Sequence, residues 1–522
     1  MTGNRTAREV VLELLRRRSV RHIFGNPGTT ELGLISGLPS DIEYVLCLQE
    51  SIAVSAATGY ALLGGRTAVV NLHALPGVGH AMGALHGAGL MHAPVVAIVG
   101  QQDSRHLASE PLLSGDVVGT ARAATRWATQ VARPEDVASA IERAFRAAST
   151  PPRGPALVAV PMDFWDGPAG APVRVAEIPS AEPGPGPLDD LRSMLASSTN
   201  GALVTGDGVD DRSAWDAAIS VAEAFDLDVY AAPIGTQPGF PTDHPRFGGN
   251  LPLVSGPLRS VLEAYDLVVV AGAPVFTTYL FDGTHAVPDD LKIALLSDDP
   301  DEAARGSGDL VVIGEPGVSL ARLVDSDGSA RGFQATTPTD PGRLEGLDLV
   351  SVMRHVAVVM PSDALLIDES MTSGTEVRRS VAVREPRQYL RTSNGVLGTG
   401  LPAAIGAAIG RPDRHVVAFL GDGSLMFAPQ ALWTAAQHDL QITVVVLDNG
   451  GYESLRGYER AHLPDRVNGS PAFDIPGIDL PALAEAMGVR GIDVATSRDL
   501  MPALTSAFGS RGPTVVVIRL GS

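Results

Sequence analysis

The amino-acid sequence predicts an α/β protein with three domains, each a mostly parallel sheet flanked by helices. Short apolar runs rich in valine and isoleucine alternate with helical patterns along the chain, which is typical of parallel sheets connected through helices. Two stretches interrupt this alternation. Residues from about 167 to 187 are rich in proline and glycine, and residues from about 325 to 346 are polar, so we interpret both as linkers. We therefore expect domains at 1–168, 186–326 and 345–522.

Each expected domain has its own set of strands, recognised as apolar, β-branched runs bounded by turn residues. The first set is Arg21–Phe24, Glu43–Leu48, Thr67–Leu72, Pro94–Val99 and Ala156–Val160. The second set is Ala202–Thr205, Asp228–Ala231, Asp266–Ala271, Lys292–Leu296 and Asp309–Ile313. The third set is Ala364–Asp368, Gln388–Arg391, His415–Leu420, Ile442–Leu447 and Thr514–Arg519. The triplet Arg-Gly-Pro precedes the last strand of the first and third sets, which suggests that the two outer domains share one fold.

Composition excludes several classes of function. A formal net charge of −20 without a basic stripe argues against nucleic-acid or anionic-membrane partners. No apolar run reaches the roughly 18 residues of a membrane span, and the N-terminus lacks the apolar stretch of a signal peptide, so we expect a soluble, cytoplasmic protein. Cys47 is the only cysteine, which excludes an intrachain disulfide or a cysteine-rich metal site and predicts a buried small hydrophobe. Lys292 is the only lysine, so a lysine-containing P-loop is absent.

The strongest chemical signal lies where two strands of the third set end. One strand runs into Gly421-Asp422-Gly423-Ser424, followed by a helix candidate at Ala428–His438, and another ends at Asp448-Asn449-Gly450-Gly451-Tyr452. Glycines at a strand-to-helix turn let backbone N–H groups approach a phosphate. Open α/β sheets bind ligands at the carboxyl ends of their strands, and one carboxylate with one amide oxygen suits Mg2+ beside phosphate oxygens. Gly-Asp-Gly alone is ordinary turn chemistry, but the asparagine after a second strand makes the signal specific.

This pair of motifs resembles the cofactor signature of thiamine diphosphate (ThDP) enzymes. The resemblance implies that ThDP and Mg2+ are bound by Gly421, Asp422, Gly423, Ser424, Asn449, Gly451 and Tyr452. The metal ligands among these would be Asp422, Asn449 and the carbonyl of Gly451. Many family members carry Asn-Asn where this chain has Asp448-Asn449.

Further segments resemble the benzoylformate decarboxylase branch of the same family. They are FGNPGTTEL at 24–32, LQE at 48–50, NLHALPGVGHAMGAL at 71–85, GQQ at 100–102, GAPVF at 272–276, GVLGTGLPAAIGAA at 395–408 and ALWTAAQ at 431–437. The resemblance implies an N-terminal aminopyrimidine-binding domain, a central nucleotide-fold-like domain without a flavin requirement and a C-terminal diphosphate- and magnesium-binding domain. It also implies at least a homodimer, with a homotetramer expected, since glutamate-bearing and diphosphate-bearing domains of different subunits meet in this family.

Glu50 is the candidate activating residue. It lies between apolar runs, and ThDP chemistry needs a carboxylic acid in an apolar setting, where the proton is held more tightly. Considered alone, Glu50 could equally be a helix-starting glutamate stabilised by the helix dipole. The resemblance assigns it the contact with the aminopyrimidine. It also assigns cofactor contacts to the turn Asn26-Pro27-Gly28, to the carbonyl of Gly395 and to Leu397, which would wedge the cofactor into its bent form.

The substrate residues follow the family pattern less closely. Thr29 stands at the position of the family's serine, and His73 matches the first of two functional histidines. An ungapped comparison places Tyr279 at the second histidine, with His285 six residues later; tyrosine donates protons but is a poor general base near neutral pH. His80 replaces an asparagine, and its role stays open. The expected pocket residues Ser454, Leu455 and Tyr458 suit an aromatic or medium-sized 2-keto acid.

The expected activity is ThDP- and Mg2+-dependent, non-oxidative decarboxylation of a benzoylformate-like 2-keto acid to an aldehyde and CO2. Glu50 would promote activation of the cofactor, which performs the bond cleavage, while His73 and Thr29 bind the carboxylate or relay a proton. The first alternative is a carboligase resembling acetolactate synthase, favoured by the missing second histidine. A catalytically silent ThDP-binding homologue is a second alternative. A nicotinamide-dependent dehydrogenase is the third, although no G-x-G-x-x-G opens a strand–helix–strand unit.

Overall fold

The computed structural model describes residues 5–170, 174, 181–306, 308–324, 341–393, 395–463, 465 and 470–521. The chain forms two compact units. The first comprises Met1–Glu177, Pro341–Val377 and Asn394–Ser522, and the second comprises Ile178–Asp340 and Arg378–Ser393. Within the described residues, no helix has the length and apolar character needed to cross a bilayer. Of the two predicted linkers, at about 167–187 and 325–346, positions 171–173, 175–180 and 325–340 lie outside the described residues.

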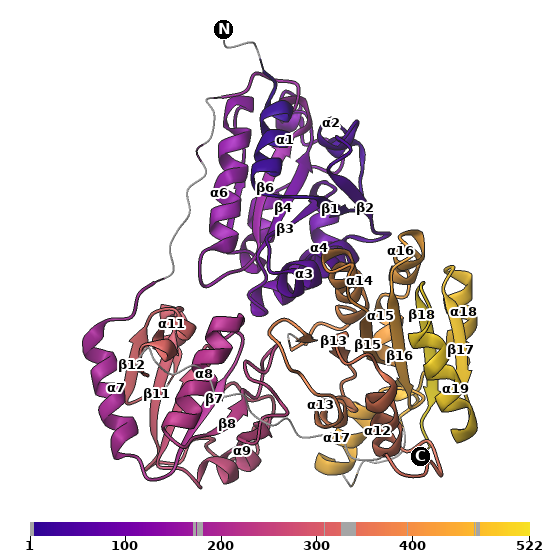
Figure 1. The fold of residues 1–522 in the computed structure, drawn as a ribbon. Coiled ribbons are helices and arrows are strands. Elements are labelled where there is room, and N and C mark those ends of the chain that lie inside the picture. The colour runs from indigo at the N-terminus through magenta and orange to yellow at the C-terminus, as the bar shows by residue number, and fades with distance from the viewer. Residues whose placement is uncertain are drawn as a thin grey trace. The chain divides into compact units, whose positions relative to one another are not determined.

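The first unit begins with a six-stranded parallel sheet of order β2-β1-β3-β4-β6-β5. The strands are β1 (His22–Gly25), β2 (Glu43–Leu46), β3 (Ala68–Leu72), β4 (Val95–Gln101), β5 (Trp127–Gln130) and β6 (Ala156–Pro161). The helices are α1 (Ala7–Arg17), α2 (Leu32–Ile35), α3 (Glu50–Gly64), α4 (Ala74–Leu90), α5 (Val117–Ala121) and α6 (Val137–Ser149). Apolar residues of α1 and α6 form one core cluster with residues of the sheet, and Figure 1 shows the two helices beside each other along it. Cys47 is buried as predicted, and burial raises the pKa of its thiol to about 12.

The C-terminal part of this unit is built on a second parallel sheet. Its strands follow the order β13-β15-β16-β18-β17. They are β13 (Leu365–Glu369), β15 (Val416–Gly421), β16 (Ile442–Asp448), β17 (Arg490–Val494) and β18 (Thr514–Arg519). The helices are α12 (Leu349–Val359), α13 (Gly374–Ser380), α14 (Gly400–Gly410), α15 (Asp422–Phe427), α16 (Ala431–Gln437), α17 (Glu453–His462), α18 (Leu480–Ala486) and α19 (Ser497–Phe508). The order repeats β1-β3-β4-β6-β5 of the first sheet, which confirms that the outer domains share one fold.

The second unit carries a six-stranded parallel sheet of order β12-β11-β10-β7-β8-β9. This is the strand order of the doubly wound dinucleotide-binding fold. The strands are β7 (Gly201–Thr205), β8 (Asp228–Ala231), β9 (Phe247–Asn250), β10 (Leu267–Ala271), β11 (Lys292–Ser297) and β12 (Leu310–Ile313). The remaining elements are α7 (Pro185–Ser197), α8 (Arg212–Ala224), α9 (Ser255–Leu262), α10 (Pro300–Arg305), α11 (Pro316–Ala321) and β14 (Tyr389–Arg391). The predicted architecture of three α/β domains with mostly parallel sheets is thus confirmed.

Two helices join the N-terminal and C-terminal parts of the first unit. A Cβ built on Gly59 of α3 would lie 2.0 Å from the Ala403 carbonyl oxygen, and one on Gly406 of α14 would lie 1.7 Å from the Ala56 carbonyl oxygen. These distances are far below van der Waals contact, so the two helix backbones approach as closely as they do only because both positions are glycine.

One predicted helix was wrong in detail. The sequence predicts a helix at Ala428–His438, whereas the structure has α15, which begins at Asp422 directly after β15, and a separate α16. Pro429 lies between them, and the residue before a proline is disfavoured in helical conformation, so the chain leaves the helix there. The consequence is that Asp422, Gly423 and Ser424 occupy the first turn of a helix.

Candidate active site

The Gly-Asp-Gly turn lies at the carboxyl end of β15. Gly421 is the N-cap of α15 and pairs with Leu447 of β16, so the register brings Asp422 and Asn449 to adjacent strand ends. The backbone of Asn449 lies close to the buried Asp422 carboxylate. A Cβ on Gly423 would lie 2.8 Å from the Tyr452 ring, so the tyrosine packs against the turn only because that residue is glycine.

Two features of this pair fit a magnesium ion. Burial, and secondarily the charge of Asp448, raises the pKa of the Asp422 carboxyl above its ordinary value. A nearby divalent cation would reverse this effect by favouring the charged form. The side-chain oxygen Oδ1 of Asn449 is buried and has no hydrogen-bond partner in the structure, which is costly unless a ligand or metal occupies it. Mg2+ prefers six oxygen ligands, so phosphate oxygens, backbone carbonyls and water would complete the set beside these two side chains.

The loop after β16 is held by a residue that the sequence analysis did not single out. The Arg456 guanidinium donates to the carbonyls of Asn449 at 3.4 Å and Gly450 at 3.1 Å, and it forms an ion pair with Asp474. Gly451 has φ +145°, and a Cβ there would lie 2.1 Å from the Phe473 carbonyl oxygen. The loop carrying Asn449 and Gly451 is therefore held on both sides by the protein's own contacts.

A buried glutamate supports the segment that precedes α14. Glu369 ends β13, and its carboxyl group accepts hydrogen bonds from the backbone N–H of Gly398 at 2.7 Å and of Gly400. Ser424 Oγ donates to the Glu369 backbone carbonyl at 2.9 Å. Burial raises the pKa of Glu369 to about 7. Leu397 is half-buried in this segment and Gly395 is exposed with φ +69°, so Glu369 links the Gly-Asp-Gly turn to the predicted aminopyrimidine contacts.

Glu50 is the first residue of α3, and Gln49 caps the helix through its side chain. The Glu50 side chain is buried although Leu48 beside it is exposed. His80 Nδ1 lies 3.1 Å from Glu50 Oε2, which places this histidine, whose role the sequence left open, in direct contact with the candidate activating carboxylate. A Cβ on Gly77 would lie 3.3 Å from Glu50 Oε1, so α4 closes over the carboxylate from one side.

His73 belongs to a buried cluster around Glu31. His73 Nδ1 lies 2.9 Å from Glu31 Oε2, the backbone N–H of Gly28 donates to the same oxygen at 2.7 Å, and the Thr30 hydroxyl donates to Oε1. Since a carboxylate accepts and does not donate, Nδ1 carries a proton, and in the neutral imidazole Nε2 then carries the lone pair. A Cβ on Gly28 would lie 2.1 Å from His73 Nδ1, so the turn can approach the imidazole only with glycine there.

The other candidates are more exposed. Thr29 is exposed, whereas Thr30, its neighbour, is fully buried. Asn26 and Gly28 are half-buried and Pro27 is exposed in the same turn. Ser454, Leu455 and Tyr458 lie exposed on α17, where the Tyr458 ring contacts that of His462 at 4.5 Å between centroids.

Tyr279 and His285 lie in the second unit, on the segment between β10 and β11, and both are exposed, Tyr279 by 76%.

The residues that sequence reasoning missed are Glu31, Glu369 and Arg456. An acidic residue inside the apolar run LLIDE signals Glu369, and Glu31 stands three residues after Gly28 in the position that caps a turn. Nothing in the sequence around Arg456 distinguishes it from a surface arginine.

Comparison with known proteins agrees with this geometry. Family-level sequence models match three parts of the chain: the N-terminal TPP binding domain of thiamine pyrophosphate enzymes at residues 5–126, the central domain at 188–323 and the C-terminal TPP binding domain at 372–518. The chain is 34% identical over 524 aligned residues to benzoylformate decarboxylase of Pseudomonas aeruginosa, with 98% of each chain covered. It is 29% identical to a putative acetolactate synthase large subunit of Mycobacterium tuberculosis, with 94% of this chain and 95% of the relative covered.

Solved structures give the same result. A ThDP-dependent 4-hydroxybenzoylformate decarboxylase of Rhodococcus jostii superposes with a TM-score of 0.91 at 36% identity, covering 99% of each chain. A benzoylformate decarboxylase of Polynucleobacter necessarius superposes with a TM-score of 0.91 at 30% identity, covering 99% of this chain and 98% of that one. The chain therefore belongs to the family of ThDP-dependent (thiamine pyrophosphate) enzymes that decarboxylate or ligate 2-keto acids.

Proposed function

We propose that this protein decarboxylates a benzoylformate-like 2-keto acid to the corresponding aldehyde and CO2, using ThDP and Mg2+. The observation that carries the proposal is that one chain holds a buried glutamate at the start of α3 and, at the ends of β15 and β16, a buried carboxylate beside an unsatisfied amide oxygen. The similarity to decarboxylases of benzoylformate and 4-hydroxybenzoylformate over nearly the full length supports the substrate class.

Asp422, Asn449 Oδ1 and the Gly451 carbonyl would hold Mg2+, and Tyr452, whose own N–H donates to the Phe473 carbonyl at 2.7 Å, would pack beside them. The backbone N–H groups of 421–424 would face the diphosphate. These donors lie at the first turn of a helix, where N–H groups lack intrahelical partners and favour anions. When bound, ThDP supplies a nucleophilic carbon and then accepts the electrons left by the departing carboxylate. The protein's task is to hold this cofactor and to manage protons around it.

Glu50 would hold a proton at the aminopyrimidine, with Gly395 and Leu397 as the other contacts of that ring. Its position supports the role because burial at a helix start keeps water away from the carboxyl group while His80 fixes the orientation of Oε2. Gly83 on α4 faces the same segment as Leu397, since a Cβ there would lie 3.8 Å from Val396 Cγ1. α4 therefore runs from the neighbourhood of Glu50 to that of the predicted aminopyrimidine contacts.

His73 would carry a proton to or from the substrate through Nε2. Glu31 fixes the tautomer that leaves Nε2 able to accept a proton, as outer carboxylates do for many functional histidines. Thr29, with an exposed hydroxyl in the same turn, would donate to the substrate carboxylate. Ser454, Leu455 and Tyr458 would line the pocket for the body of the keto acid. A role for Tyr279 or His285 in substrate binding stays a prediction.

The quaternary state and the location belong to the same proposal. We expect a homotetramer built from homodimers, because family members complete their sites between subunits. A cytoplasmic location and domain limits near 168, 186, 326 and 345 stay predictions. Sedimentation of the purified protein with and without ThDP would measure the oligomer.

The direct test measures CO2 release and identifies the organic product from benzoylformate and from pyruvate, with ThDP and Mg2+ present or absent. Cofactor-dependent formation of benzaldehyde is expected. Glu50→Gln should lower turnover by orders of magnitude with the fold preserved, whereas Glu135→Gln, an exposed glutamate of the same domain, should not. Wild-type turnover in Glu50→Gln would remove this residue from the mechanism.

A carboligase is the second candidate. It is favoured by Tyr279 at the position of the second histidine, since a site with less assistance for protonation leaves more opportunity for attack on a second carbonyl. Analysis of the same reactions for acyloin products, with an added acceptor aldehyde, separates the two. Acyloin as the main product without free aldehyde would replace decarboxylation by ligation.

A further inference from the structure

The second unit contains a segment that is distant from the rest of the unit in the sequence. Residues Ile178–Asp340 form most of the unit, and Arg378–Ser393 joins them from the C-terminal part of the chain. We call Arg378–Ser393 the inserted segment. Residues to which the proposed function assigns cofactor contacts follow it directly, because Gly395 lies two positions after Ser393 and Leu397 lies four. The way in which the inserted segment is held therefore bears on the expected aminopyrimidine contacts.

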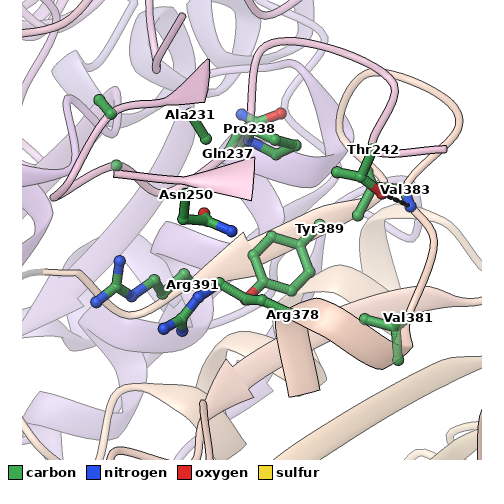
Figure 2. Close-up of a pocket in the computed structure, with 12 residues that line it drawn as sticks. Ala231, Gln237, Pro238, Thr242, Asn250, Arg378, Val381, Val383, Tyr389 and Arg391 are labelled. Carbon is green, nitrogen blue, oxygen red and sulfur yellow. Dashed lines mark hydrogen bonds between the residues drawn. The ribbon is translucent and has the colours of Figure 1, made fainter. Parts of the chain in front are cut away.

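Two side chains accept hydrogen bonds from the backbone of the inserted segment. Gln237 Oε1 accepts from the N–H of Arg387 at 3.0 Å, and Thr242 Oγ1 accepts from the N–H of Val383 at 2.9 Å. Figure 2 shows the second bond as a dashed line, beside the small pocket that lies between the two stretches of chain. The N–H of Thr242 in turn donates to the Val383 carbonyl at 2.9 Å. The residues after β8 thus hold the inserted segment at two points.

The conformation of Arg387 depends on contacts of this kind. Its φ is +59°, in the left-handed region. A residue with a side chain is strained there and keeps this conformation only when the surrounding structure holds it. Gln237 is buried and bonds to the Arg387 N–H itself, and the Arg387 guanidinium pairs with Asp210 at 3.4 Å. The turn of the inserted segment at Arg387 is therefore fixed from within the second unit.

Gln237 is itself held by the turn after β7. Asp207 Oδ1 accepts from the backbone N–H of Gln237 at 3.1 Å, and from the N–H and the hydroxyl of Thr236 at 2.7 and 2.6 Å. The Thr236 carbonyl accepts from the N–H of Arg391 at 2.8 Å, which adds a third point of attachment near the end of the inserted segment. One carboxylate therefore orders two residues that each bond to the inserted segment.

The turn that carries Asp207 lies where doubly wound sheets usually bind ligands. Such ligands lie beyond the carboxyl ends of the strands at which the strand order reverses, which here are β7 and β10. In this chain the turns after the two strands pack directly on each other, since a Cβ on Gly208 would lie 2.7 Å from Gly272 Cα. The Asp207 carboxylate bonds to Thr236 and Gln237. This end of the sheet thus holds the protein's own chain.

We propose that Gln237 and Thr242 are positioning residues for the cofactor. By holding the inserted segment, they fix where the chain enters the stretch that contains Gly395 and Leu397, and they act through the chain rather than by contact with ThDP. The inference rests on the proposed function, which assigns Gly395 and Leu397 to the aminopyrimidine. Loss of either acceptor should then weaken binding of the aminopyrimidine part of ThDP and leave binding of the diphosphate part, at the ends of β15 and β16, unchanged.

The test uses the full-length protein stripped of cofactor and compares ThDP with inorganic diphosphate, each titrated calorimetrically in the presence of Mg2+. Gln237→Met and Thr242→Val nearly keep the size of the side chain and remove the acceptor. Each should raise the Kd of ThDP by roughly 2- to 30-fold, the usual range for residues that act through a chain of contacts. The Kd of inorganic diphosphate should not change. In the protein without cofactor, hydrogen exchange of the backbone N–H groups of 378–393 should become faster in both variants.

Thr199→Val is the matched control in the same unit. It removes a hydroxyl that donates to Asp266 at 2.7 Å, away from the inserted segment, so both affinities and the exchange of 378–393 should stay unchanged. The inference is overturned if either variant folds and binds ThDP like the wild type. It is also overturned if the affinities for ThDP and diphosphate fall together, as a general loss of structure would cause. A wild type that binds diphosphate but not ThDP would refute the proposed function, and this inference with it.

Discussion

Glu31→Gln is the most informative single change, because it keeps the shape of a buried side chain and alters only its hydrogen bonding. Glu31 is 1% exposed and accepts from His73 Nδ1, from the Gly28 backbone and from the Thr30 hydroxyl. A glutamine amide presents one oxygen and one NH2 group. If the NH2 group faces the imidazole, Nδ1 must accept, and the proton moves to Nε2. His73 then offers a donor where the proposed mechanism needs an acceptor.

The expected size of the effect follows from the bond that is lost. A hydrogen bond to a charged group contributes about 1.5–3 kcal/mol. At about 1.36 kcal/mol per factor of ten, this corresponds to a decrease in kcat/KM of roughly 10- to 160-fold. ThDP affinity should change much less than kcat/KM, because Glu31 reaches the expected cofactor contacts only through the backbone N–H of Gly28.

The assay is steady-state decarboxylation of the 2-keto acid that the wild type turns over, with ThDP binding measured separately by tryptophan fluorescence. His73→Ala provides the second arm of a double-mutant cycle. If Glu31 acts through the tautomer of His73, Glu31→Gln should have little further effect in the His73→Ala background. Equal losses in both backgrounds would refute the reasoning and leave Glu31 with a purely structural role.

Three other changes have defined outcomes. Burial raises the pKa of Glu369 from 4.5 to about 7, so between these pH values the folded state keeps a proton that the unfolded chain loses. The free energy of unfolding should therefore fall by about 3 kcal/mol as the pH rises through this range. Glu369→Gln should flatten this pH dependence, as measured by chemical denaturation at pH 4 to 8. Gly100→Ala would place a Cβ 1.8 Å from Glu31 Oε1 and should lower the free energy of unfolding by about 1–3 kcal/mol. Gly79→Ala is the control, because no neighbouring segment comes within 4 Å of its Cβ, and it should not lower stability. Equal melting temperatures for the two variants would contradict the packing argument. Asn449→Ala should weaken Mg2+-dependent ThDP binding at least as much as the roughly 10- to 100-fold typical of outer-shell changes, as measured by titration after chelator treatment. Unchanged affinity would exclude its Oδ1 as a ligand.

The central strands could be predicted from sequence because burial on both faces demands continuous apolar runs. Each of the strands that the prediction missed, β5, β9 and β17, lies at an edge of its sheet. Their burial is partial and irregular, with exposed residues inside or at the end of each strand. An edge strand has only one neighbour to satisfy and one flank open, so its composition overlaps with that of a loop.

In the candidate site, local motifs could be predicted from the sequence, but contacts between distant segments could not. Motifs that are contiguous in the chain, such as Gly421–Ser424, could be recognised because a strand end and a helix start define their local geometry. The contact of Glu31 with His73 joins residues more than forty positions apart, and only the order of β1 and β3 in the sheet brings them together. The burial of Thr30 rather than Thr29 depends on the direction of one short turn, which composition does not encode.

By itself the sequence determined the fold class and the paired outer domains, because periodic apolar patterns and glycine-rich strand ends are local consequences of backbone geometry. Its resemblance to ThDP enzymes identified the cofactor family. Only the tertiary structure decided which polar side chains lose their water and meet one another. It placed His80 against Glu50, buried Glu369 beneath the start of α14 and joined Gln237 to Arg387 within the second unit. The physical reason is that desolvation and pairing depend on packing between distant segments, whereas helix and strand formation depend mainly on neighbouring residues.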